Sequence, residues 1–143
     1  MTCLFCAIAA GERPAPVVLD EPEVVGFLDA RPLFKGHTLL VPRRHVGTLV
    51  DIDTDALTLV MAAAQRVAAA LVAALGAQGS FVAMNNVVSQ SVPHLHVHVV
   101  PRTKGDGLRG FFWPRTRYAD DAEAQSYAAR LAAALPPAAA ASA

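Results

Sequence analysis

Three histidines stand at alternate positions in the run His94-Leu95-His96-Val97-His98, and this spacing is the strongest chemical signal in the sequence. Residues two apart on a β-strand share a face, so we expect the imidazoles on one side and the apolar side chains in the core on the other. A half-exposed strand also alternates, but its outer positions draw on many polar residue types. Three histidines therefore favour a site for chemistry or for a metal.

Two kinds of site need imidazoles in this arrangement. A His-x-His pair on a strand is a common pair of metal ligands, but hydrolytic metal sites of that sort usually add carboxylates, and none lies in or beside the run. The other kind is nucleophilic catalysis, because neutral imidazole can attack phosphorus near neutral pH and leave a phosphohistidine that water then cleaves. Flanking imidazoles can orient the nucleophile and donate protons. The lack of carboxylates favours catalysis and keeps the metal site as the alternative.

The elements that must position these histidines predict an α+β domain with a mostly antiparallel sheet. Short apolar runs bounded by turn residues are typical of strands. About five such runs occur, at residues 17–19, 24–28, 38–41, 80–84 and 95–100. The last strand is expected to pair with the run at 80–84.

Two helices complete the prediction. Apolar residues recur at helical spacing from Asp53 to Leu75, with Asp53 or Thr54 to cap the start and Gly76 to end the helix. A second helix is expected from Asp120 to Leu135, with acids at its start. We therefore expect one domain over residues 1–135 and a Pro/Ala-rich tail over residues 136–143.

The histidine run resembles the His-φ-His-φ-His-φ-φ signature of the histidine-triad (HIT) superfamily, in which φ is apolar. Other segments resemble the family too, at residues 3–14, 27–29, 36–45, 90–93 and 101–102. The resemblance implies a HIT-like fold, a homodimer, and transfer or hydrolysis of nucleoside monophosphate groups through attack by the middle histidine on the α-phosphate. The uridylyltransferase branch has Gln where this chain has His98, so the resemblance favours the hydrolase branches.

Carried over position by position, the resemblance makes His96 the nucleophile and places His94, His98 and His37 in the catalytic group. It also assigns Asp29 to the ribose hydroxyls, a role that suits a carboxylate because it can accept two hydroxyl hydrogen bonds. The alternative for Asp29 is a turn acid at the end of a strand. The remaining substrate-binding positions precede the triad and are Asn85, Ser89, Gln90 and Ser91.

The loop before the triad departs from the family pattern. Many members carry Asn-x-Gly-x-x-Ala-Gly-Gln there, a glycine-rich loop whose amides face phosphate. In this chain the corresponding loop, residues 85–90, is shorter than that pattern and contains no glycine. The amides of Ser89 and Ser91 can still form the cradle, and we expect substrate preference to differ from the best-known branches.

Residues 101–115 concentrate arginine, lysine, glycine and aromatic side chains just beyond the triad. One interpretation is a lid over the leaving group, in which Arg109 meets its negative charge and Trp113 shields or stacks on it. The other is a buried aromatic plug with solvated arginines. The sequence leaves both open.

Cys3 and Cys6 have the spacing of half a zinc site. A redox pair would be expected at a helix start after a strand, and no strand is predicted before Cys3. The resemblance to zinc-containing HIT proteins and to galactose-1-phosphate uridylyltransferases implies that His45 and His94 complete a structural zinc site. The alternative is a pair of buried free thiols.

Charge and hydropathy narrow the class of protein. Twelve basic and twelve acidic residues cancel, so we expect no general attraction for nucleic acid. The sequence shows no secretory signal and predicts no membrane span. Two closely spaced cysteines fit a reducing, cytoplasmic setting.

The expected function is hydrolysis or transfer of nucleotides at the α-phosphate. Candidate substrates are dinucleoside polyphosphates, nucleoside phosphoramidates and adenylyl sulfate. The alternative is a non-catalytic regulatory protein that binds nucleotides at the same site.

Overall fold

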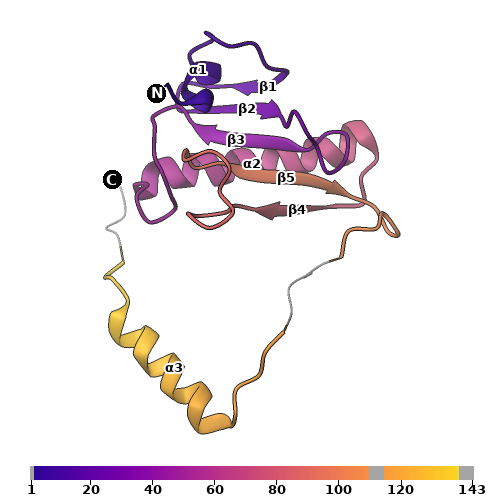
Figure 1. Ribbon diagram of the computed structural model, residues 1–143. Helices are drawn as coiled ribbons and strands as arrows, with labels where there is room; N and C mark the ends of the chain where they lie inside the picture. Colours follow the sequence, from indigo (N-terminus) through magenta and orange to yellow (C-terminus); the bar gives the residue numbers. More distant parts are fainter. Residues whose placement is uncertain (1, 110–114, 139–143) are drawn as a thin grey trace. The chain divides into compact units, whose positions relative to one another are not determined.

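The computed structural model describes residues 2–109 and 115–138 (Figure 1). The chain divides into two compact units, Met1–Asp106 and Gly107–Ala143. The histidine triad and the cysteines belong to the first unit. A single domain over residues 1–135 stays a prediction.

The first unit is built on a five-stranded sheet in which all neighbouring strands are antiparallel. Its order is β1-β2-β3-β5-β4, so β4 pairs with β5 as expected. The strands are β1 (Val17–Asp20), β2 (Val24–Leu28), β3 (Thr38–Pro42), β4 (Gly79–Ala83) and β5 (Val97–Arg102). The predicted α+β class is confirmed.

Strand β5 begins two residues later than predicted. The β3–β5 ladder ends at the pair Leu40–Val97, and β3 then reaches Pro42, which has no N–H to donate. The N–H of Leu95 instead donates to the carbonyl of Val46 at 2.7 Å. His94 and His96 therefore lie on the segment that leads into β5, and His98 lies within the strand.

Helix α2 (Thr54–Leu75) covers one face of the sheet, and Figure 1 shows it behind the strands. Both predicted caps are confirmed: the Asp53 side chain accepts from the N–H of Ala56, and Gly76 adopts a φ of 70°. The core on this face joins α2 to the apolar residues of the histidine run. Its buried members are Val24, Leu40, Val60, Ala63, Ala64, Val67, Leu71, Ala77, Leu95, Val97 and Val99.

The other face is covered by α1 (Leu4–Ala9), a helix that the sequence did not predict. The helix has six residues, which are too few for a helical period to be recognised in the sequence. Phe5 and Ala9 bury their side chains in a second core cluster with Val25, Phe27, Leu39 and Val41. The histidine face of the triad lies on this side, because its apolar residues face α2.

The length and composition of α2 contradict the expectation that no segment reaches the size of a membrane span. The helix has 22 residues, and its mean hydropathy reaches 1.8. Core helices of globular domains have the same properties. Here the side that contains Val60, Val67 and Leu71 is buried against the sheet. Only 28% of the apolar stretch is buried, and its exposed large apolar side chains are Leu59, Met61, Val72 and Leu75.

The second unit contains α3 (Asp121–Ala134), which confirms the predicted C-terminal helix. The Asp120 side chain accepts from the N–H of Glu123 and caps its start. The rings of Tyr118 and Tyr127 pack at 5.6 Å, and Arg130 lies over the Tyr127 ring.

Candidate active site and metal centre

The histidine triad is buried. His94 is 0% exposed and His96 is 2% exposed, while His98 is half-buried. The rings of His96 and His98 lie 5.0 Å apart. His37, the residue before β3, is 3% exposed and packs its ring 5.1 Å from that of His98. Burial excludes a half-exposed polar strand, because that interpretation needs the imidazoles in solvent.

The hydrogen bond of His96 determines which ring nitrogen can react. His96 Nδ1 lies 2.8 Å from the carbonyl oxygen of His94, which can only accept. Nδ1 therefore carries the proton, and Nε2 of the neutral ring keeps its lone pair. The chain thus holds the middle histidine in the tautomer that a nucleophile at Nε2 requires.

A second chain of hydrogen bonds fixes the tautomer of His98. The N–H of Leu33 donates to Nδ1 of His37 at 3.1 Å, so the neutral His37 ring carries its proton on Nε2. That Nε2–H donates to Nδ1 of His98 at 2.9 Å. His98 consequently carries its own proton on Nε2, which makes it a hydrogen-bond donor to an anionic ligand.

Asp29 lies beside this chain at the end of β2. Its Oδ1 accepts from the N–H of Arg31 at 2.9 Å. This bond is the one expected of a turn acid at the end of a strand, the alternative role for Asp29. Its Oδ2 lies 3.6 Å from Nε2 of His37. Asp29, His37 and His98 are close enough to hold a metal, but ligation through Nε2 of His37 would move its proton to Nδ1, where the N–H of Leu33 already donates. A hydrogen-bond chain fits these three residues better than a metal site.

Burial keeps the imidazoles of His37 and His98 neutral. It lowers the pKa of His37, although Asp29 opposes the shift. Burial, together with smaller effects of the neighbouring His96 and His37, lowers the pKa of His98 to about 4, although Asp29 opposes this shift too. Near neutral pH both rings therefore act as neutral hydrogen-bonding groups.

These shifts predict that the protein loses stability in weak acid. The unfolded chain, in which the pKa of histidine is about 6.5, binds more protons than the folded chain between about pH 6.5 and pH 4. The contribution of His98 is therefore complete above about pH 6.5 and is lost as the pH falls toward 4. Urea unfolding at several pH values across this window should show a falling midpoint. His98→Asn does not titrate and should give a shallower decline, and equal slopes for the two proteins would contradict this origin.

Phe5 is a part of the site that the sequence analysis missed. Its buried ring packs edge-on at 5.1 Å from the ring of His96 and at 6.1 Å from that of His94. The sequence did contain a signal for Phe5, which lies between Cys3 and Cys6. If both cysteines bind a metal with His94, Phe5 must also lie close to the triad. Phe5 thus restricts the orientation of the nucleophile from the α1 side.

The loop before the triad exposes three of its predicted substrate-binding residues, Asn85, Ser89 and Ser91. Gln90 is half-buried and uses both side-chain groups inside the protein: Oε1 accepts from the N–H of Val87, and Nε2 donates to the carbonyl of Gly47. Contact of these four residues with substrate stays a prediction.

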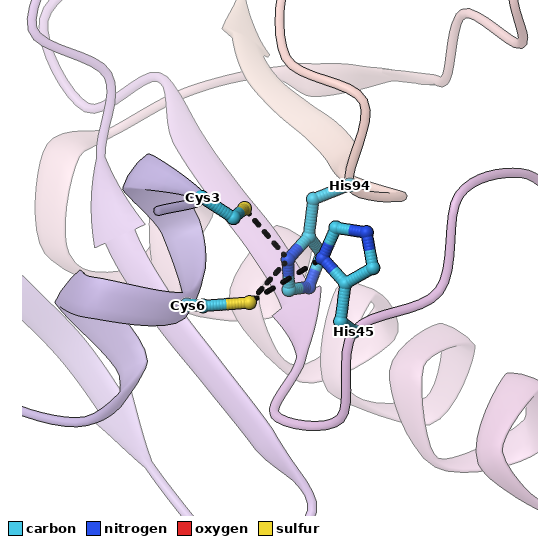
Figure 2. Close-up of side chains that lie close together, drawn as sticks. All are labelled: Cys3, Cys6, His45 and His94. Carbon is cyan, nitrogen blue, oxygen red and sulfur yellow. Dashed lines mark hydrogen bonds between the residues drawn. The ribbon is translucent and has the colours of Figure 1, made fainter. Parts of the chain in front are cut away.

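The predicted metal ligands come together in one cluster (Figure 2). Cys3, the residue before α1, and Cys6 within α1 point at Nδ1 of His94, at 3.4 and 3.5 Å, and Cys6 lies 3.3 Å from Nδ1 of His45. The four ligand atoms lie within 4.8 Å of one another.

The donor set of this cluster fits zinc. In a tetrahedral site with ordinary Zn–S and Zn–N bonds, sulfur and nitrogen ligands are separated by about 3.5 Å, close to the distances observed. Nε2 of His94 donates to the carbonyl oxygen of Pro42 at 2.8 Å, so Nδ1 keeps its lone pair for a metal. A possible Cys/His metal site is therefore present.

The segment beyond the triad is only partly described. Pro101 and Arg102 belong to β5, and Arg102 pairs with Asp106. Arg109 is exposed and belongs to the second unit. Trp113 lies outside the described residues, so the proposed lid stays a prediction.

Comparison with known proteins shows the family of this chain. A model of the HIT domain matches residues 10–105. An uncharacterised HIT-like protein of Mycobacterium tuberculosis is 41% identical over 110 residues, which are 76% of each chain. An adenosine 5′-monophosphoramidase of Schizosaccharomyces pombe is 28% identical and covers 80% of this chain and 84% of its own. An adenylylsulfatase of Arabidopsis thaliana is 30% identical over 74% of this chain and 55% of its own.

Solved structures show the same fold. A HIT-family protein of Bacillus subtilis superposes with a TM-score of 0.84 at 29% identity, over 96% of this chain and 100% of the other. A zinc-bound histidine-triad protein of Mycobacterium smegmatis superposes with a TM-score of 0.73 at 34% identity, over 94% and 99%. The chain therefore belongs to the HIT family.

Proposed function

We propose that this protein is a nucleotide hydrolase or nucleotidyl transferase in which Nε2 of His96 attacks the α-phosphate. The observation that carries the proposal is the tautomer of His96, whose Nδ1 donates to the carbonyl of His94 and whose Nε2 is left with its lone pair. In the first step an N–P bond forms and the bond from phosphorus to the leaving group breaks. In the second, water or another acceptor takes the nucleotidyl group from His96.

Neighbouring groups suit the charge that develops at phosphorus. The Nε2–H of His98 is a neutral donor for a phosphoryl oxygen, because its other nitrogen accepts from His37. Within residues 2–109 and 115–138, no backbone hydrogen bond uses the N–H groups of Ser89 or Ser91. We assign these amides to phosphate, and we assign Oδ2 of Asp29 to the ribose hydroxyls because Oδ1 already accepts from the N–H of Arg31.

Two relatives bear names that narrow the substrate, an adenosine 5′-monophosphoramidase and an adenylylsulfatase. Release of AMP from adenosine 5′-phosphoramidate, adenylyl sulfate and diadenosine polyphosphates would test the proposal directly. We expect turnover of at least one of the three. Binding of AMP without turnover of any would instead favour a regulatory nucleotide-binding protein.

We also propose that Cys3, Cys6, His45 and His94 hold a structural zinc, supported by the tetrahedral fit and by the zinc-bound relative. All four positions are protein ligands, so such a zinc would have no open position for substrate. Bound there, it would fix the segment that leads into β5. We further propose a homodimer, as the family resemblance implies, and a cytoplasmic location, which the two free thiols favour.

The role proposed for Arg109 predicts an effect that depends on the leaving group. If its guanidinium meets the leaving group, Arg109→Ala should lower kcat/KM for adenylyl sulfate, whose leaving group is an anion, roughly tenfold or more. Turnover of a phosphoramidate with a neutral amine leaving group should hardly change. The ratio of the two kcat/KM values cancels general damage to the fold. Equal losses on both substrates would assign Arg109 a structural role, and Arg115→Ala offers the same comparison.

A further inference from the structure

Two residues in the loop before the triad have a backbone conformation that favours glycine. Val87 and Ser89 have φ values of 66° and 61°, although no residue from 85 to 90 is a glycine. The left-handed region is sterically costly for residues with a Cβ atom, and most of all for a β-branched residue such as valine. The loop is therefore strained at two positions.

Packing does not hold this strained loop in place. The side chain of Val87 is 76% exposed and that of Val88 is 79% exposed. Ser89 is exposed as well. A costly backbone conformation persists only where the surrounding structure over-determines it. With so little burial, hydrogen bonds must supply the restraint.

Gln90 supplies that restraint from within the same loop. Its Oε1 accepts from the N–H of Val87 at 2.9 Å, and its Nε2 donates to the carbonyl of Gly47 at 2.7 Å. A parallel bond runs from the N–H of Leu49 to Oδ1 of Asn86 at 2.7 Å. These bonds fasten the loop to residues 47–49. The side chain of Gln90 bonds both to Val87 in the loop and to Gly47 outside it.

The fastened loop leads straight into the catalytic segment. The amides of Ser89 and Ser91 have no backbone partner in the described part of the chain, and backbone N–H groups near a left-handed residue form a concavity that suits an anion. From Ser91 only Val92 and Pro93 separate the loop from His94. The direction of these amides therefore depends on whether Val87 and Ser89 keep their conformation.

We propose that Gln90 is a positioning residue, which holds Val87 and Ser89 in the left-handed conformation and so aims the loop amides at the α-phosphate. The inference rests on the proposed function. It differs from direct contact between Gln90 and substrate, because both polar groups of the side chain are engaged inside the protein. Loss of Gln90 acts through the loop and leaves the tautomer of His96 unchanged.

The first measurement compares Gln90→Ala with the wild-type full-length protein. AMP affinity by calorimetry should fall about tenfold, the scale expected when hydrogen bonds that order a binding loop are lost. KM for adenosine 5′-phosphoramidate should rise by a larger factor than that by which kcat falls. Gln65→Ala removes the same atoms from the exposed surface of α2 and should change neither quantity.

The decisive measurement is rescue by glycine. Val87→Gly removes the steric cost of the left-handed conformation, so the Gln90→Ala/Val87→Gly protein should recover AMP affinity to within about threefold of wild type. Val87→Ala retains a Cβ atom and should recover less. A contact between Gln90 and phosphate could not be restored in this way, because no glycine replaces the lost amide group.

The outcomes separate the inference from the function on which it rests. Wild-type protein that neither binds AMP nor turns over any of the three nucleotides overturns both. Active wild-type protein with a Gln90→Ala variant of unchanged AMP affinity and KM overturns only the role of Gln90. A loss of affinity that Val87→Gly does not relieve also overturns it, since Gln90 would then act by another route.

Discussion

Replacing His96 with alanine is expected to lower turnover of adenosine 5′-phosphoramidate at least about a hundredfold, while AMP still binds. No neighbouring imidazole can take its place. Nδ1 of His98 accepts from His37 and its Nε2 carries a proton. His94 uses Nε2 for the carbonyl of Pro42 and turns Nδ1 toward the cysteines. The lone pair on Nε2 of His96 is therefore the one that the triad can offer to phosphorus.

His98→Asn is the matched control for this experiment. An asparagine amide can accept from His37 through its oxygen and still present an N–H to the phosphate. We expect His98→Asn to lose clearly less turnover than His96→Asn, although both exchange an imidazole for the same amide. Stopped-flow turnover and AMP calorimetry on both variants would measure the difference. Near-normal turnover by His96→Ala would show that the nucleophile is misassigned.

Much of the fold could be predicted because its signals are local. The caps of α2 depend on Asp53 and Gly76 alone, and the alternation of the histidine run places its apolar residues against α2 without further information. Helix α1 was missed because its six residues are stabilised by burial of Phe5 and Ala9 rather than by a period. The start of β5 depends on Pro42 in the neighbouring strand, which the sequence of β5 does not contain.

The site, too, could be predicted only where its signals are local in the sequence. The spacing of the triad predicts that its imidazoles share a face, and the tautomer of His96 depends on the carbonyl of His94 two residues away. The tautomers of His98 and His94 depend on the amide of Leu33 and the carbonyl of Pro42, which are distant in sequence from the triad. The absence of glycine from the loop before the triad was visible. That Val87 and Ser89 nevertheless adopt glycine-like conformations required the structure, because the restraint comes from Gln90 and its bond to Gly47.

The second large effect is expected at the Cys/His cluster, where protein prepared without chelators should contain about one zinc per chain. Cys6→Ser should lose the metal and lower the thermal unfolding temperature by on the order of 10 °C. The reason is that the cluster fastens α1 to the segment before β5: Cys3 precedes α1, Cys6 lies within it, and a third ligand is His94. Elemental analysis and thermal unfolding with and without a chelator would measure both effects.

His45→Asn separates a zinc site from a pair of thiols that merely pack together. His45 is exposed, so its replacement should cost little if the cysteines serve only as apolar filling. If His45 is the fourth ligand, His45→Asn should lose zinc as Cys6→Ser does, and a chelator should no longer change the unfolding temperature of either variant. Both variants should keep more turnover than His96→Ala, because the carbonyl of His94 still orients His96 when the metal is gone. A wild-type protein without zinc, or a His45→Asn protein that retains it, would leave the cysteines as thiols and His94 held by Pro42 alone.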